Sequence, residues 1–316
     1  FSYILISITT FLKLYHFLKN KKENDLIIIH LLSSLPLLMI SLFSFRCKFA
    51  LRISGLPYMN FLRKYLWRSS NSKLSFITCP TNDTRNDLLK LKIFSEEKIF
   101  HLRDPSISIN EINSKKKEMI EKEIKSKKYF LSIGRLTNQK NHEFLIDVFY
   151  EFQKNNKEYH LIIIGDGEKK DFLNQKITNL KIEKNVKILG YRKNVFSYFF
   201  NSECFIQSSK WEDPGFAMIE AAASRIPIIT SDCKNGPKEF IQDGKAGYIY
   251  ENLNSLKCLY KMKEFIENNK NEEQKKIIFL KKLNALKEAK KYTKYSHFKK
   301  LTEIFNKLNF GFIYER

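Results

Sequence analysis

The feature that most constrains the fold is an alternation of short apolar runs with helical segments between residues 129 and 250. The apolar runs have the composition of buried strands and cover residues 129–133, 160–164, 186–189, 204–207, 226–230 and 247–250. The segments between them place apolar residues at helical spacing. Because parallel strands need a crossover connection, usually a helix, this alternation predicts a doubly wound parallel sheet with helices on both faces.

A fainter version of the same pattern occupies the first third of the chain. Its predicted strands are residues 26–29, 47–53 and 74–78. A run of mixed charge at residues 114–128 is typical of a solvated helix in a linker. We therefore predict two α/β domains, residues 1–120 and residues 121–290.

The formal charge of +22 leaves two interpretations open. It suits an anionic partner such as a membrane surface or a phosphorylated substrate, and it also follows from a composition rich in Lys, Asn, Ile and Phe. No nucleic-acid-binding signature accompanies the charge, so no nucleic acid partner is predicted. The five cysteines are scattered and form no CxxC pair. That arrangement argues against a disulfide framework or a zinc site and fits a reducing cytoplasm.

One apolar stretch, from Leu26 to Phe45, is long enough to span a bilayer. Polar residues and a proline interrupt it at His30, Ser33, Ser34 and Pro36. It divides naturally into a strand at residues 26–29 and a helix at residues 35–44. We therefore favour a buried strand and a helix over a transmembrane segment.

The loops that follow the strands carry the candidate site, because ligands bind at the carboxyl ends of the strands in a doubly wound sheet. The loop after residue 133 begins with Gly134 and holds Arg135 and Lys140. A planar guanidinium and a mobile ammonium together suit a diphosphate, although basic residues in loops are more often simply solvated. The next such loop begins with Gly165, and its GxG pattern indicates a tight turn more readily than a nucleotide site.

The segment from Trp211 to Glu220 is the most informative of these loops. Glu212 lies in the loop, Gly215 lies where a helix is expected to begin, and Glu220 lies about one turn into that helix. Free N–H groups at a helix N-terminus attract phosphate. Carboxylates bind sugar hydroxyls through charge-assisted hydrogen bonds worth roughly 1.5–3 kcal/mol each. From the residues alone, a surface position for Glu212 and a lysine partner for Glu220 are equally acceptable.

In order and spacing, these segments resemble glycosyltransferase family 4, whose members are retaining enzymes of the GT-B architecture, with two Rossmann-like domains. The similarity covers about residues 125–250, and the Glu-x7-Glu spacing is its most specific element. It rests on Gly134–Asn141, Gly165–Gly167, Glu212–Ala223 and Ser231–Glu239. A fainter similarity to capsular and lipopolysaccharide-type members lies in residues 25–36, 52–57 and 78–81.

The resemblance implies a role for each candidate residue. Arg135 and Lys140 would bind the donor diphosphate, Glu212 would contact the transferred sugar, and Glu220 would contact the nucleotide ribose. The other implied donor-site residues are Gly134, Gly165, Gly215, Phe216, Ala217 and Arg192, the last in the loop against the nucleobase. No metal and no separate cofactor are implied: the donor is a UDP- or GDP-linked sugar, and the sequence has no DxD at a strand end.

The sequence departs from the family pattern in its N-terminal part. Family members begin with a strand and a Gly-rich loop that this sequence lacks, so the resemblance implies an incomplete N-terminal domain. Some members have a catalytic histidine after an early strand, and His30 is the candidate, with the segment Arg52–Gly55 as a competing match. Residues 291–316 would form a helix that crosses back to the N-terminal domain.

The predicted function is transfer of a hexose or hexosamine from a nucleotide sugar to a glycan or lipid-linked saccharide in bacterial surface polysaccharide synthesis. Retention of configuration and metal independence are implied by the resemblance. The expected location is the cytoplasm, at the cytoplasmic face of the inner membrane, with peripheral association to the anionic bilayer. Two alternatives remain open: a non-catalytic nucleotide-sugar-binding homologue or truncated fragment, and a GT-B-fold epimerase.

Overall fold

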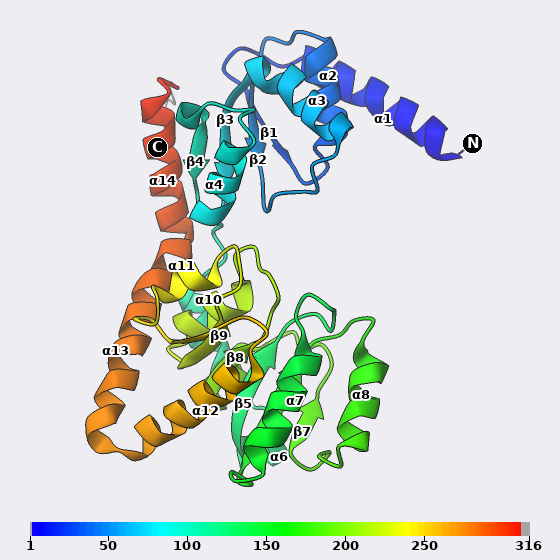
Figure 1. Ribbon diagram of the computed structural model, residues 1–316. Helices are drawn as coiled ribbons and strands as arrows, with labels where there is room; N and C mark the ends of the chain where they lie inside the picture. Colours follow the sequence, from blue (N-terminus) through cyan, green and yellow to red (C-terminus); the bar gives the residue numbers. More distant parts are fainter. Residues whose placement is uncertain (1, 311–316) are drawn as a thin grey trace. The chain divides into compact units, whose positions relative to one another are not determined.

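The computed structural model describes residues 2–310, with side chains from Thr9 onward, and the chain divides into two compact units (Figure 1). The first unit holds the residues up to Arg103 and the segment that begins at Glu303, and the second holds Asp104–Thr302. The boundary falls earlier than the predicted residue 120, because Ile107 and Ile112 are buried in the core of the second unit.

The predicted last helix corresponds to α14 (Lys294–Lys307), which begins in the second unit and ends in the first. The rings of Phe305 and Phe310 lie 6.0 and 5.9 Å from the ring of Phe76 in the first unit. Residues 311–316, which the prediction included in this helix, lie outside the described residues.

A four-stranded parallel sheet forms the centre of the first unit, with its strands side by side in sequence order. The strands are β1 (Leu26–His30), β2 (Lys48–Arg52), β3 (Leu74–Cys79) and β4 (Ile99–His101). The helices are α1 (Ser2–Lys19), α2 (Ser34–Leu42), α3 (Phe61–Ser70) and α4 (Asn82–Lys90). The three strands predicted here are confirmed, and β4 is too short for its pattern to reveal it.

The second unit contains a six-stranded, wholly parallel sheet of order β10-β9-β8-β5-β6-β7. The strands are β5 (Lys128–Ile133), β6 (Tyr159–Ile164), β7 (Val186–Ile188), β8 (Cys204–Gln207), β9 (Ile228–Ser231) and β10 (Tyr248–Tyr250). The helices are α5 (Ile109–Lys115), α6 (Lys122–Lys125), α7 (His142–Gln153), α8 (Lys170–Asn179), α9 (Phe196–Asn201), α10 (Phe216–Ala223), α11 (Pro237–Ile241), α12 (Ser255–Lys270) and α13 (Glu272–Ala289). The predicted doubly wound sheet is confirmed.

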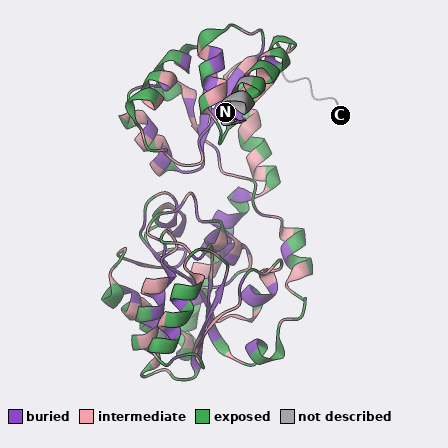
Figure 2. Ribbon diagram, turned by 90° about the vertical axis from the view of Figure 1, so that its right-hand side faces the viewer, coloured by how far each residue is buried: buried purple, intermediate pink, exposed green. Residues whose placement is uncertain are grey.

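Both faces of this sheet are covered, which is why its strands are continuous apolar runs rather than alternating ones. One core cluster joins the sheet to α7, α8 and α12, and the other joins it to α9, α10 and α11. Figure 2 shows the strands as buried ribbon between partly exposed helices. The sheet is therefore a rigid base, and its carboxyl-end loops are held by packing on two sides.

The long Lys-rich segment between residues 254 and 290 forms two helices, α12 and α13. They meet at Asn271, whose side chain accepts hydrogen bonds from the backbone N–H groups of Glu273 and Gln274. This is an N-cap that starts a new helix. No helix among the described residues is long and apolar enough to cross a membrane, and Leu26–Phe45 contains β1 and α2 as predicted.

The loops after β5 and β6 are joined by backbone hydrogen bonds. Leu136 N–H donates to the carbonyl of Asp166 (2.9 Å), and Lys169 N–H donates to the carbonyl of Leu136 (3.0 Å). Gly165 has φ +153°, and a Cβ atom added there would lie 1.9 Å from the carbonyl oxygen of Gly134. Any side chain at residue 165 would therefore push the two loops apart.

Gly165→Ala should lower the free energy of unfolding by about 3 kcal/mol, because backbone must move to admit one methyl group. Gly190→Ala is the matched control. Gly190 also has a positive φ, +71°, but a Cβ there meets only the Lys170 ammonium at 3.9 Å. Its cost should be about 1 kcal/mol, from conformation alone. Chemical denaturation measures both, and equal losses would contradict the close-approach argument.

Candidate functional site

A buried ion pair lies at the carboxyl ends of β5 and β8, which are neighbours in the sheet. Lys140 Nζ lies 2.6 and 2.8 Å from the two carboxylate oxygens of Glu212. Glu212 is only 3% exposed, and the hydroxyl of Ser209 donates to the same carboxylate. A buried carboxylate with a cation and a hydroxyl on it has its charge compensated, so it can be held without neutralising.

The loop that carries Lys140 is docked on the loop that carries Glu212 by further hydrogen bonds. The N–H of Lys210 donates to the carbonyl of Gln139 (2.8 Å), and the Gln139 amide donates to the carbonyl of Trp211 (3.0 Å). The Ser208 hydroxyl contacts the carbonyls of Lys140 and Asn141 at 3.1 and 3.0 Å. The two loops therefore form one rigid corner above the sheet.

Arg135 and Gly134 occupy the outer side of this corner. The Arg135 side chain is exposed and has one hydrogen bond within the described part of the chain, to Gln139 at 3.3 Å. Gly134 packs on the aliphatic part of Lys140, since a Cβ at residue 134 would lie 3.1 Å from Lys140 Cδ. Most of the guanidinium donors of Arg135 thus remain available to an anion.

The N-terminus of α10 lies directly beside Glu212. Gly215 caps this helix with φ +92°, and a Cβ there would lie 3.4 Å from Glu212 Cγ. Phe216 is exposed and Ala217 partly exposed, and the N–H groups of a helix's first turn have no intrahelical acceptor. The corner therefore presents backbone donors next to the Lys140–Glu212 pair, a combination suited to an anion bonded to a hydroxylated group.

Glu220 is the second acidic residue of this segment, and its environment is different. It is partly buried in α10, and its carboxylate has no hydrogen bond or ion pair with any described residue. Burial, with a smaller contribution from the negative charge of Glu111, raises the pKa of Glu220 to about 7. A desolvated carboxylate without a donor is destabilised, and hydroxyl groups of a ligand would supply the missing hydrogen bonds.

Two predicted residues are engaged elsewhere. The Arg192 guanidinium, in the loop after β7, lies 3.0 Å from a Glu121 carboxylate oxygen and 3.2 Å from the hydroxyl of Tyr198. His30 ends β1 in the first unit, where its Nε2 lies 2.7 Å from the Ser54 hydroxyl, and it is exposed. Gly165, as described above, serves the packing of two loops. The structure therefore brings together Gly134, Arg135, Lys140, Glu212, Gly215, Phe216 and Ala217 at one corner.

Sequence reasoning missed the serines that complete this corner. Ser208 and Ser209 directly follow β8, and both hold loop atoms through their hydroxyls. Ser231 at the end of β9 donates to the Ser209 carbonyl at 2.9 Å. Their position immediately after buried strands was a usable signal, because polar residues there face the binding edge of the sheet. Among the described residues, no three His, Cys, Asp or Glu side chains are grouped to hold a metal ion.

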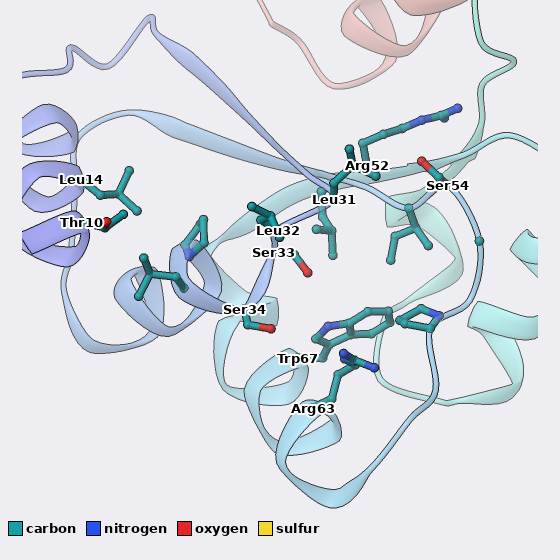
Figure 3. Close-up of a pocket in the computed structure, with 16 residues that line it drawn as sticks. Thr10, Leu14, Leu31, Leu32, Ser33, Ser34, Arg52, Ser54, Arg63 and Trp67 are labelled. Atoms are coloured by element: carbon teal, nitrogen blue, oxygen red, sulfur yellow. The ribbon is translucent and has the colours of Figure 1, made fainter. Parts of the chain in front are cut away.

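A cavity of about 670 Å³ lies in the first unit, at the carboxyl ends of β1 and β2. Leu31 and Leu32 border it on one side, and Trp67 and Arg63 of α3 border it on the other (Figure 3). Most of its lining is apolar, and Arg63 supplies a positive charge. The cavity therefore suits an amphipathic group rather than a free sugar.

Three comparisons connect this geometry to known proteins. The family profile described as "Glycosyl transferases group 1" matches residues 114–279. The chain is 28% identical over 206 residues to poly(ribitol-phosphate) alpha-N-acetylglucosaminyltransferase of Staphylococcus aureus, covering 65% of this chain and 39% of that protein. A second relative is N-acetylgalactosamine-N,N'-diacetylbacillosaminyl-diphospho-undecaprenol 4-alpha-N-acetylgalactosaminyltransferase of Campylobacter jejuni. The chain is 32% identical to it over 143 residues, which cover 45% of this chain and 38% of that protein.

A solved structure supports the fold over most of the chain. The crystal structure of Anabaena HepE in complex with UDP has a TM-score of 0.76 at 16% identity, covering 94% of this chain and 81% of that one. With two parallel-sheet α/β units, the predicted GT-B fold class is confirmed. The chain spans 28% to 39% of the length of the first curated relatives that it matches.

Glu220→Gln should stabilise the protein without ligand, and the gain should depend on pH. The pKa of Glu220 is raised from 4.5 to about 7, so the folded state binds this proton more tightly than the unfolded state between those values. Wild-type stability therefore falls as pH rises through that window. Glutamine, which stays neutral, avoids the loss and should gain about 3 kcal/mol at pH 8 and nothing near pH 4.5.

Urea denaturation at several pH values measures this gain. Glu168→Gln is the control, because Glu168 is an exposed acid in the loop after β6, and its change should stay within about 0.5 kcal/mol. A Glu220→Gln gain that did not vary with pH would contradict a desolvated, proton-binding Glu220.

Proposed function

Because the chain belongs to the group 1 glycosyl transferases, we propose that it transfers a sugar from a nucleotide-sugar donor bound at the corner formed by the Lys140 and Glu212 loops. The observation that carries this proposal is the partly buried carboxylate of Glu220, which has no partner among the described residues and lies in the helix whose N-terminus borders that corner. The α10 N-terminus and the cations suit a diphosphate, while the two carboxylates suit hydroxyl groups.

In this proposal each residue has a separate role. Arg135 reaches the diphosphate as the exposed, mobile cation. Lys140 holds the Glu212 carboxylate and adds positive charge beside the leaving group. Glu212 accepts hydrogen bonds from the transferred sugar, and Glu220 accepts them from the ribose. Cations and helix-end N–H groups fixed before reaction stabilise the negative charge that develops on the departing nucleoside diphosphate.

The finer assignments follow the resemblance. We propose a retaining, metal-independent hexosyltransferase of family 4, acting on a glycan or lipid-linked saccharide in surface polysaccharide synthesis at the cytoplasmic membrane face. Two relatives named above, one acting on poly(ribitol-phosphate) and one on a diphospho-undecaprenol-linked saccharide, support this acceptor class. Their names do not favour the epimerase or the non-catalytic alternative. Because HepE was solved with UDP, we propose UDP over GDP.

The first test is donor binding by thermal shift in the presence of EDTA, with UDP-linked and GDP-linked sugars compared. A UDP-sugar should raise the melting temperature of the wild type, and Glu220→Ala should abolish most of that shift. Losing two hydrogen bonds to a charged acceptor corresponds to a 10²-fold or greater loss of affinity, roughly 3 kcal/mol. Glu168→Ala should bind like the wild type. Binding that needs a divalent metal, or that is equal in both variants, would contradict the proposed site.

The affinity for a UDP-sugar should rise about tenfold between pH 6 and pH 8. Only the ionised Glu220 carboxylate accepts hydrogen bonds from both ribose hydroxyls, and its pKa of about 7 makes the ionised fraction grow roughly tenfold over this range. A sugar nucleotide is suitable because its diphosphate stays fully ionised throughout. Calorimetric titration measures the trend, which Glu220→Gln should remove. An affinity independent of pH in the wild type would show that Glu220 does not face the donor.

A further inference from the structure

The surface of α3 and the segment before it has an unusual distribution of apolar side chains. Tyr58, Phe61, Leu62 and Tyr65 are 86%, 81%, 74% and 65% exposed. Helical spacing places Phe61, Leu62 and Tyr65 on one side of α3, and Tyr58 lies in the segment just before the helix. Trp67 and Ser70, on the other side of α3, are buried in the first unit. Four adjacent large apolar side chains facing outward form a patch, which in soluble proteins marks an interaction surface.

The charges around this patch have a single sign. Lys64 and Arg68 follow the apolar residues at helical spacing, and neither has an acidic partner within the described residues. From Leu26 to Asn82 the sequence contains no Asp or Glu and seven Lys or Arg. With 34 acids among 316 residues, an average stretch of this length would hold about six. A composition rich in Lys does not by itself remove every Asp and Glu from a stretch of this length. The positive charge of this stretch therefore points to a specific anionic partner for this part of the surface.

We propose that this patch, Tyr58–Arg68, docks the first unit on an anionic lipid bilayer. Aromatic side chains at the two ends of an apolar face, with cations beside them, are the pattern of a helix that lies in the membrane interface. Anionic lipid headgroups would pair with the charges of Lys64 and Arg68. A protein surface with few acidic side chains would leave both charges unpaired. This assignment rests on the proposed function, since it names the surface that brings the enzyme to a lipid-linked acceptor.

The cavity in the first unit lies on the inner side of the same segment. Arg63 and Trp67 of α3 face Leu31 and Leu32 across it, and both leucines are exposed (Figure 3). Exposed apolar side chains therefore occur both on the outer face of α3 and, at Leu31 and Leu32, in the lining of the cavity. An anionic bilayer would match the apolar face, the exposed leucines and the cations Lys64 and Arg68 together.

Co-sedimentation of the full chain with vesicles tests the proposal. Wild type should bind vesicles of phosphatidylcholine with about 30% phosphatidylglycerol, bind phosphatidylcholine alone much more weakly, and lose most binding between about 0.1 M and 0.5 M salt. Lys64→Glu with Arg68→Glu should reduce partitioning about tenfold or more, because each lost cation removes roughly a fivefold factor. Phe61→Ser with Leu62→Ser should reduce it by a similar amount, since both apolar anchors are lost.

Matched controls lie on helices of the second unit. Lys263→Glu with Lys270→Glu changes two exposed lysines of α12, and Phe279→Ser with Leu280→Ser changes two exposed apolar residues of α13. These controls make the same types of substitution as the α3 variants but away from the assigned surface, so both should leave vesicle binding within about twofold of the wild type. If the controls lose as much binding as the α3 variants, the attraction is general and the assigned surface is wrong.

Two further readouts separate this proposal from the donor site. UDP-sugar thermal shifts should be unchanged in all the α3 variants. Failure of the donor-site proposal would appear as a missing thermal shift in the wild type, and failure of the membrane proposal as unchanged vesicle binding in the α3 variants. Light scattering reports whether the Phe61→Ser and Leu62→Ser changes dissociate an oligomer. A patch that holds two copies together, with vesicle binding unaltered, would overturn the membrane assignment in favour of self-association.

Discussion

The Lys140–Glu212 ion pair is the interaction on which the candidate site depends. It joins the loops after β5 and β8, two strands that are adjacent in the sheet but far apart in sequence. Charging a buried carboxylate costs several kcal/mol unless a cation and hydrogen bonds compensate it, and here Lys140 and Ser209 do so. The same compensation fixes the geometry, because a carboxylate held by two partners cannot rotate to follow a ligand.

Glu220 shows the opposite solution to the same problem. It shares the loop–helix segment with Glu212, but no described residue donates to it, and its pKa rises toward neutrality. The two carboxylates therefore differ in their environment: Lys140 and Ser209 compensate the charge of Glu212, whereas Glu220 has no hydrogen-bond donor among the described residues. Stability is sacrificed at Glu220 in the unliganded state, and that is the usual sign of a group arranged for a ligand rather than for the fold.

Much of the fold could be predicted because its signals are local. Continuous apolar runs predicted both parallel sheets, while β4 was missed because a strand of three residues is too short to show a pattern. The site was predictable only in part. Spacing and resemblance identified Glu212 and Glu220. What distinguishes them, an ion pair with Lys140 for Glu212 and no partner among the described residues for Glu220, depends on long-range packing. For the same reason the sequence could not show that Arg192 is held by Glu121 and Tyr198.

The charge of the chain shows how structure resolves an ambiguity that composition leaves open. A net charge of +22 is compatible with both a biased composition and an anionic partner, because the net charge does not say where on the surface the charged residues lie. Once the residues are placed, many cations of the second unit are seen to have acidic partners, such as Lys176 with Asp147 and Lys187 with Glu123. The stretch around α3 has no acid to provide such a partner, and its cations adjoin exposed apolar side chains. Exposed apolar area is unfavourable in water, and cations without acidic neighbours attract an anionic partner. The two features together are therefore a stronger argument for a partner than either one by itself.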